Sequence, residues 1–162
     1  MQIKANQKML LLRYSNYKKY NFIEEHVKTL AEKGTVWMLK IGKNIPENKL
    51  KDIYDEGGVL VLRSPKADGS KYYKIEVRSC LNGDPNCEMV YPDYYEDMLD
   101  DEDMWGMDTM DGTWFEVSSI KELPDGASSH FWLISNGKKV EDVLSSTRSS
   151  MIYIKSDKDI VI

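Results

Sequence analysis

The chain has 162 residues, of which 41% are hydrophobic and 30% are charged, and these proportions are typical of one globular domain, not of a disordered chain. No apolar run approaches the roughly 18 residues that a transmembrane helix needs, and the first apolar run is too short for a secretory signal. The sequence therefore predicts a single domain over residues 1–162 that is cytoplasmic and has no membrane partner.

The net charge of −5 is distributed unevenly. Twelve of the 27 acidic residues, and none of the 22 basic ones, lie between Arg78 and Lys121, which leaves 15 acidic and all 22 basic residues for the other 120 positions. We therefore expect a mildly basic domain that carries an acidic insertion loop over residues 82–112. Such an asymmetry indicates partners of two signs or one switchable surface.

A buried strand and a helix open the chain. The run "QKMLLLRYS" predicts the strand. Helix signals follow, because Asn21 is a good N-cap, Glu24 completes a capping box and Gly34 ends the helix. The apolar side chains at helical spacing are Ile23, Val27 and Leu30. His26 lies on the same helix, where a solvated or hydrogen-bonded histidine is the ordinary case.

A second strand and helix follow, and then a hairpin. Residues 35–42 are rich in β-branched and aromatic side chains, which favour a strand. Pro46 suits a first helical turn, and the glycine pair at 57–58 ends a helix that has Leu50, Ile53 and Tyr54 on one face. The runs "VLVLRS" and "KYYKIEVRS" are joined by turn residues and predict two hairpin strands.

Strands and one helix also follow the acidic insertion. "GTWFEVSSIKEL" predicts a strand, "HFWLISNG" fits either a strand or a helix, and "MIYIKS" predicts a closing strand. "KKVEDVLSS" predicts a short helix with Val140, Val143 and Leu144 facing inward. Because no βαβ units repeat, the order favours an α+β fold, a small β-barrel with short flanking helices, over a doubly wound sheet.

Six segments between residues 34 and 155 follow one another in a suggestive order: "VWMLKIG", "EGGVLVLRS", "KYYKIEVRS", "YPDYY", "GTWFEVSSIKELP" and "LSSTRSSMIYI". In order and local composition they resemble the PUA-like superfamily and, within it, the EVE-type domains. The resemblance implies a PUA-like barrel that binds nucleic acid, or holds one modified nucleobase in an aromatic pocket. A base stacked on an aromatic ring gains about 1–3 kcal/mol.

The resemblance also implies ligand-binding residues, because Trp37 and Tyr91 match aromatic positions of the family and Arg148 to Ser150 match its closing loop. We add Trp114, which begins a strand directly after the insertion, where a pocket wall would stand, and Arg63 as a basic residue. Arginines would contact phosphate or a base edge, and the closing loop would complete the site. The predicted residues are Trp37, Arg63, Tyr91, Trp114, Arg148 and Ser150. Tryptophans in barrel strands also serve as core residues, so that alternative stays open.

The acidic segment conflicts with a nucleic-acid ligand, because its nine carboxylates over residues 93–111 would repel phosphate on the same face. A solvated loop is one alternative, and a metal site is another, although the EF-hand order is absent. The third is an inhibitor or adaptor of a mobile element or phage that mimics nucleic acid and binds a basic protein such as a nuclease. The residues predicted for that partner are Asp97, Asp100, Asp101, Glu102, Asp103 and Trp105.

Catalytic motifs are absent from the sequence. It has no nucleophile elbow, no histidine pair with metal-ligand spacing, and no phosphate or dinucleotide loop. The sequence therefore predicts a protein that is not an enzyme and has no cofactor. A hydrolase built on Glu76, Asp93 or Glu116 is the enzymatic alternative.

Overall fold

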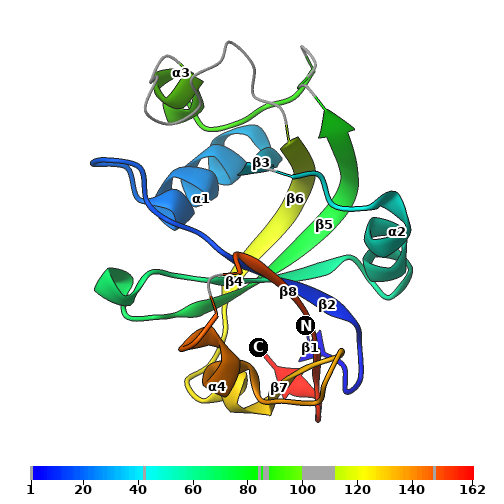
Figure 1. The fold of residues 1–162 in the computed structure, drawn as a ribbon. Coiled ribbons are helices and arrows are strands. Elements are labelled where there is room, and N and C mark those ends of the chain that lie inside the picture. Colours follow the sequence, from blue (N-terminus) through cyan, green and yellow to red (C-terminus); the bar gives the residue numbers. More distant parts are fainter. Residues whose placement is uncertain (1, 42, 84, 86–87, 100–111, 148) are drawn as a thin grey trace. The chain divides into compact units, whose positions relative to one another are not determined.

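The computed structural model describes residues 2–41, 43–83, 85, 88–99, 112–147 and 149–162 (Figure 1). Its helices are α1 (Phe22–Lys33), α2 (Glu47–Asp55), α3 (Tyr94–Leu99) and α4 (Val140–Leu144), with short 3-10 turns at Lys66–Asp68 and Ala127–His130. One sheet has the strand order β3-β6-β5-β4-β2-β8-β7. The seven strands are β2 (Met9–Arg13), β3 (Val36–Ile41), β4 (Val59–Arg63), β5 (Tyr72–Gly83), β6 (Gly112–Glu122), β7 (Phe131–Leu133) and β8 (Met151–Ser156). The fold therefore mixes helices and sheet, as the sequence predicts.

The contacts divide the chain into two compact units. The first unit is built from Met1–Ser15, Asp52–Glu76 and Ile120–Ile162, and the second from Asn16–Lys51 and Val77–Ser119. Strands β5 and β6 contribute residues to both units. The expectation of one domain over residues 1–162 stays a prediction. None of the helices in the described ranges is long and apolar enough to cross a membrane.

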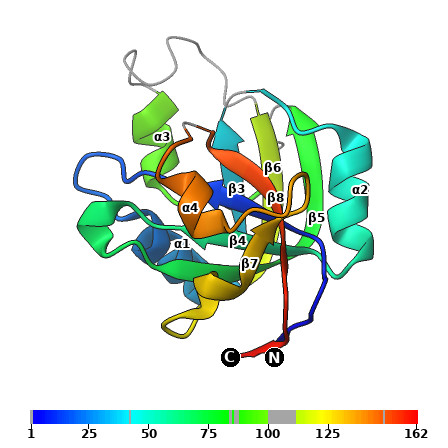
Figure 2. The ribbon, with the colours of Figure 1, turned by 60° about the horizontal axis from the view of Figure 1, so that its bottom comes forward.

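The first unit is centred on β2, which pairs with β4 in parallel and with β8 in the antiparallel direction. The runs "MLLLR" and "VLVLR" are continuous and apolar because the first four residues of each strand are buried. Two strands of two residues each, β1 (Gln2–Ile3) and β9 (Ile160–Val161), pair separately and hold the chain ends side by side (Figure 2). The sequence did not predict this pair, because two residues carry no periodic signal.

In the second unit, α1 packs beside β3, and β3 pairs with β6 in the antiparallel direction (Figure 1). The helix begins and ends where the sequence predicts. The Oδ1 atom of Asn21 accepts a hydrogen bond from the Glu24 N–H at 3.0 Å, and Gly34 adopts φ 78°, a conformation that favours glycine. Local capping therefore determines both ends of α1.

The buried faces of two helices differ from the predicted ones. On α1 the buried residues are Phe22, Ile23 and His26, whereas Val27 is 43% exposed. The face is shifted because the His26 imidazole has hydrogen-bond partners in the interior. On α2, Leu50 and Ile53 are buried, but Tyr54 is 53% exposed, so the buried face is narrower than the apolar spacing indicates.

Three parts of the segment over residues 82–112, for which the sequence predicts a loop, have regular structure. Strand β5 continues to Gly83, β6 begins at Gly112, and helix α3 forms inside the segment. The helix has a buried face made of Tyr94, Tyr95 and Met98, whose spacing brings them to one side. The segment "HFWLISNG", which fits either a strand or a helix from its sequence, contains the short strand β7.

Candidate functional site

An aromatic cluster forms in the second unit around β3, β6 and α3. Its buried members are Tyr17, Leu39, Met89, Tyr94, Tyr95, Met98 and Trp114. Tyr20, Trp37 and Tyr91 are half-buried and pack against it. The cluster thus brings together the three aromatic residues that the sequence predicts for a ligand pocket.

Helix α3 is anchored directly on this cluster. The Tyr95 ring centroid lies 5.9 Å from that of Trp114 and 5.5 Å from that of Tyr91, and the Tyr91 and Trp114 centroids are 5.7 Å apart. Tyr94 stacks on Tyr20 at 5.2 Å. Ring pairs at such distances each stabilise a contact by about 0.5–1.5 kcal/mol beyond burial. The start of the acidic segment is therefore held in place by aromatic packing.

A series of buried hydrogen bonds also holds Tyr95 in place. The Leu39 N–H donates to the Tyr95 hydroxyl at 3.2 Å, and that hydroxyl lies 2.6 Å from His26 Nε2. His26 Nδ1 lies 2.7 Å from the Phe22 carbonyl oxygen, which can only accept, so Nδ1 carries the proton and Nε2 accepts from Tyr95. Burial lowers the pKa of His26 to about 4, and burial raises the pKa of Tyr95 well above its usual value. Both groups are therefore neutral at pH 7, and they act in structure.

Carboxylates line the solvent side of α3. The Tyr91 hydroxyl donates to Glu96 Oε1 at 2.7 Å, and the Tyr20 hydroxyl donates to Asp97 Oδ2 at 2.7 Å. Burial and then the bond to Glu96 raise the pKa of Tyr91 to about 12, and the bond to Asp97 raises the pKa of Tyr20. Glu96 and Asp97 are exposed. Two phenols of the cluster thus position two negative charges at the surface.

The predicted aromatic residues differ in their accessibility. Trp37 and Tyr91 are half-buried, whereas Trp114 is fully buried with 0% exposure. Because protein atoms cover both faces of the Trp114 ring, its placement does not support direct stacking on a ligand; it is a core residue. Trp37 is held from its backbone, where its N–H donates to the Val90 carbonyl at 2.7 Å.

Two other predicted residues, Arg63 and Ser150, lie in the first unit. Arg63 ends β4 and lines a pocket, and Ser150 is exposed in the closing loop. Between β4 and this loop lies Arg13, which is the register partner of Arg63 and whose N–H donates to the Ser150 carbonyl at 2.9 Å. Sequence reasoning missed Arg13. The repeated pattern of "MLLLR" and "VLVLR" places an arginine at the end of each run, but it does not show that the two strands are parallel neighbours.

The remaining predicted residues lie outside the described residues. They are Asp100, Asp101, Glu102, Asp103 and Trp105 of the acidic segment and Arg148 of the closing loop. Of the predicted partner-binding set, the structure describes Asp97 alone.

Two of the three carboxylates of the enzymatic alternative make structural contacts, and the third, Asp93, is exposed. Glu116 accepts hydrogen bonds from the hydroxyls of Ser79 at 3.0 Å and Thr35 at 3.4 Å, and Glu76 is paired with Lys74 at 3.0 Å. Within the described ranges, no group of three or more His, Cys, Asp or Glu side chains could hold a metal ion. These contacts give no support to hydrolysis by these two residues.

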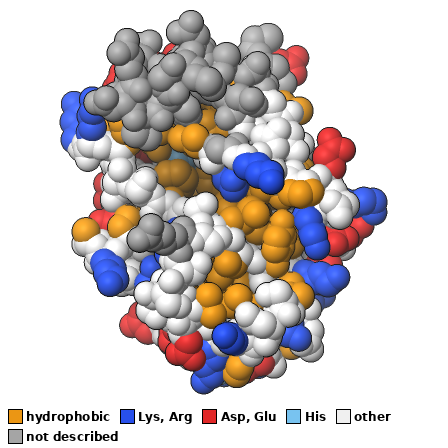
Figure 3. All heavy atoms as spheres, in the orientation of Figure 1, with side chains coloured by type: hydrophobic (Ala, Val, Ile, Leu, Met, Phe, Trp, Pro, Cys, Tyr) orange, Lys and Arg blue, Asp and Glu red, His pale blue; other side chains and the backbone are white. Residues whose placement is uncertain are grey.

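Figure 3 shows Lys and Arg side chains and, beside them, hydrophobic side chains among the described residues. A nucleic-acid surface usually concentrates basic groups, because phosphate contacts supply most of its affinity.

Comparisons with protein-family models, with curated proteins and with solved structures found no match. The class that can be stated is therefore the one that the fold and the site define: a small protein of mixed helix and sheet, in which a short acidic helix is anchored on an aromatic cluster.

Proposed function

We propose that this protein is not an enzyme but an adaptor or inhibitor that binds a basic protein surface through its acidic segment. The observation that carries the proposal is the anchoring of α3, whose buried side holds Tyr94, Tyr95 and Met98 while Glu96 and Asp97 face solvent. A segment that served solubility alone would need no aromatic anchor and no buried hydrogen-bond chain.

Preorganisation is the physical advantage of this arrangement. Because the phenols of Tyr91 and Tyr20 already hold the two carboxylates, a partner that binds them does not have to order their side chains. Opposite charges across an interface raise the association rate and select the partner, and both effects weaken as salt rises. The acidic run continues along the chain with Asp100, Asp101, Glu102 and Asp103. A run of such carboxylates can imitate the phosphates of a nucleic acid and so occupy a nuclease.

Charge-neutralising variants test the proposal. Glu96→Gln with Asp97→Asn keeps acceptor oxygens for both phenols but removes two charges, and Glu32→Gln with Asp52→Asn is a matched control at exposed positions of other helices. We expect the tagged protein to capture a basic protein from lysate, and double-stranded DNA to displace that protein. The α3 variant should lose the capture, and the control should keep it. The proposal would be refuted if the α3 variant, and a further variant neutralised at residues 100–103, captured the basic protein as well as the control variant does.

A second candidate is the reading of a modified nucleobase or of single-stranded nucleic acid by a PUA-like barrel of EVE type. One observation favours it: Trp37 and Tyr91 keep part of their side chains accessible at the margin of the aromatic cluster. Fluorescence polarisation with short labelled oligonucleotides at low salt tests it. We expect Trp37→Leu to weaken binding and Trp132→Leu, at a half-buried tryptophan of the first unit, to leave it unchanged. Absence of binding to DNA and RNA, modified or not, would exclude this candidate.

A further inference from the structure

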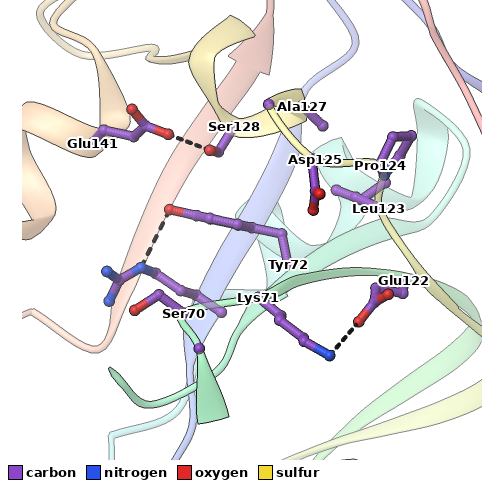
Figure 4. A pocket seen from close by; sticks show the side chains of 13 residues that line it. Ser70, Lys71, Tyr72, Glu122, Leu123, Pro124, Asp125, Ala127, Ser128 and Glu141 are labelled. Atoms are coloured by element: carbon purple, nitrogen blue, oxygen red, sulfur yellow. Dashed lines mark hydrogen bonds and ion pairs between the residues drawn. The ribbon is translucent and has the colours of Figure 1, made fainter. Parts of the chain in front are cut away.

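The first unit contains a pocket of about 640 Å³, well away in the sequence from α3 (Figure 4). Four stretches of chain line it: the end of β4, the start of β5 with the turn before it, residues 122–128, and the first turn of α4. A volume of this size accommodates a ligand as large as a nucleotide. Because the pocket belongs to the first unit alone, ligand binding in it does not depend on the function proposed for α3.

Tyr72 crosses the pocket and is held at both ends. Its ring packs edge-on against Phe131 with a centroid distance of 6.2 Å, and its hydroxyl accepts a hydrogen bond from Arg63 Nε at 3.2 Å (Figure 4). The Arg63 guanidinium also lies 6.0 Å from the Tyr72 ring centroid. Among the described residues, the Tyr72 O–H donates no hydrogen bond, and the two terminal nitrogens of Arg63 have no hydrogen-bond partner. A phenol proton and a guanidinium fork are thus available together for one ligand group.

A second guanidinium lies next to this pair. Arg13 is the register partner of Arg63, and its terminal nitrogens donate to the carbonyls of Leu144 at 2.5 Å and Thr147 at 3.1 Å. Its Nε is buried without a hydrogen-bond partner among the described residues. Burial and then the charge of Arg63 lower the pKa of Arg13. Neither arginine forms an ion pair with a carboxylate in the part of the chain that the structure describes. Arg13 does not itself line the pocket, but its charge adds to that of Arg63, and two neighbouring positive charges favour an anion at Arg63.

The acidic side of the pocket defines the rest of the ligand. Lys71 and Glu122 neutralise each other through an ion pair of 3.2 Å. Glu141 accepts a hydrogen bond from the Ser128 hydroxyl, and Asp125 also lines the pocket (Figure 4). A carboxylate can only accept hydrogen bonds, so these two carboxylates are suited to the hydroxyl groups of a sugar.

We propose that this pocket binds the phosphate ester of a sugar or a nucleoside, with the phosphate on Arg63 and Tyr72 and the hydroxyls of the sugar on Glu141. Arginine suits the phosphate because its planar fork forms two parallel hydrogen bonds to one such group. The pocket volume leaves room for a base beyond the sugar, so a sugar phosphate and a nucleotide share this chemistry.

Calorimetric titration of the purified protein distinguishes a sugar phosphate ligand from a nucleotide. The titrants are inorganic phosphate, ribose 5-phosphate, adenosine monophosphate, guanosine monophosphate and adenosine. We expect binding of the phosphate esters, weaker binding of inorganic phosphate, and none of adenosine. A nucleotide that binds more tightly than ribose 5-phosphate identifies a base subsite, and equal affinities identify a sugar phosphate site.

Variants assign the roles. Arg63→Lys keeps the charge but loses the fork, and should weaken ester binding about 10-fold. Tyr72→Phe should weaken it less, and Glu141→Gln should weaken ribose 5-phosphate but leave inorganic phosphate unchanged. Arg78→Lys, at an exposed position of the second unit, is the matched control. The proposal fails if no ester binds at millimolar concentration, or if Arg63→Lys binds as well as the unchanged protein while both melt at the same temperature.

Discussion

Lowering the pH should destabilise the second unit through one residue, His26. Its imidazole is buried, its Nε2 accepts the Tyr95 hydrogen, and burial lowers its pKa from 6.5 to about 4. Below pH 6.5 the unfolded chain binds a proton on this residue, whereas the folded chain binds it only near pH 4. The contribution of His26 to stability is therefore complete above pH 6.5 and is lost as the pH falls toward 4.

The magnitude follows from the two pKa values. The difference between the pKa values of the unfolded and folded chain corresponds to about 3 kcal/mol of unfolding free energy in total. About 2 kcal/mol of this is lost by about pH 5. This loss is a substantial fraction of the roughly 5–15 kcal/mol that stabilises an ordinary domain. Protonated Nε2 can no longer accept the Tyr95 hydrogen, so the loss should be accompanied by release of α3 from the cluster.

Urea unfolding between about pH 8 and about pH 4.5 measures the effect, with His26→Gln as the variant that cannot titrate. Carboxylates titrate in both proteins, so the difference between the two curves isolates His26. The chain has only two histidines, so NMR can follow the His26 imidazole directly. Two results would refute the reasoning. One is a difference in unfolding free energy between the unchanged protein and His26→Gln that stays constant with pH, and the other is a His26 imidazole that titrates near pH 6.5.

Three further changes probe single contacts in thermal or urea unfolding. Tyr95→Phe removes the acceptor of Leu39 N–H and the donor to His26, and should cost about 2 kcal/mol; an unchanged melt would mean that the buried chain contributes little. Asn21→Ala should cost about 1 kcal/mol and Asn21→Ser much less, because serine also caps a helix; equal losses would argue against capping. Gly112→Ala should cost about 1–3 kcal/mol, because its Cβ would lie 2.4 Å from the Lys40 carbonyl oxygen; a stable variant would show that the β3–β6 pair can shift.

The parts of the fold that depend on local signals could be predicted from the sequence. Asn21 and Gly34 indicate the ends of α1 in the sequence, because capping residues act within one helical turn. The runs of β2 and β4 are recognisable because both faces of each strand are buried, and the hairpin of β4 and β5 follows from its turn residues.

The site depends on contacts between distant residues, and these could not be predicted. His26 and Tyr95 are 69 residues apart, and nothing near His26 in the sequence indicates a phenol partner. Helix α3 could not be recognised within the long acidic run, because the three apolar residues of its buried face span less than two helical turns. The pairing of Arg13 with Arg63 requires that β2 and β4 be parallel neighbours, a topology that the apolar runs do not specify.

The two candidate functions require opposite charges on the ligand that approaches Tyr91. The Tyr91 ring lies against Tyr95 and Trp114, while its hydroxyl donates to Glu96. A base that stacked at this margin would bring its phosphate toward Glu96 and Asp97, whereas a basic protein would meet the same carboxylates with attraction. Removing their charge with Glu96→Gln and Asp97→Asn should therefore weaken a basic protein partner and strengthen an oligonucleotide. Because the two effects have opposite signs, one double variant assayed against both ligands decides which of them the aromatic cluster and its acidic helix serve.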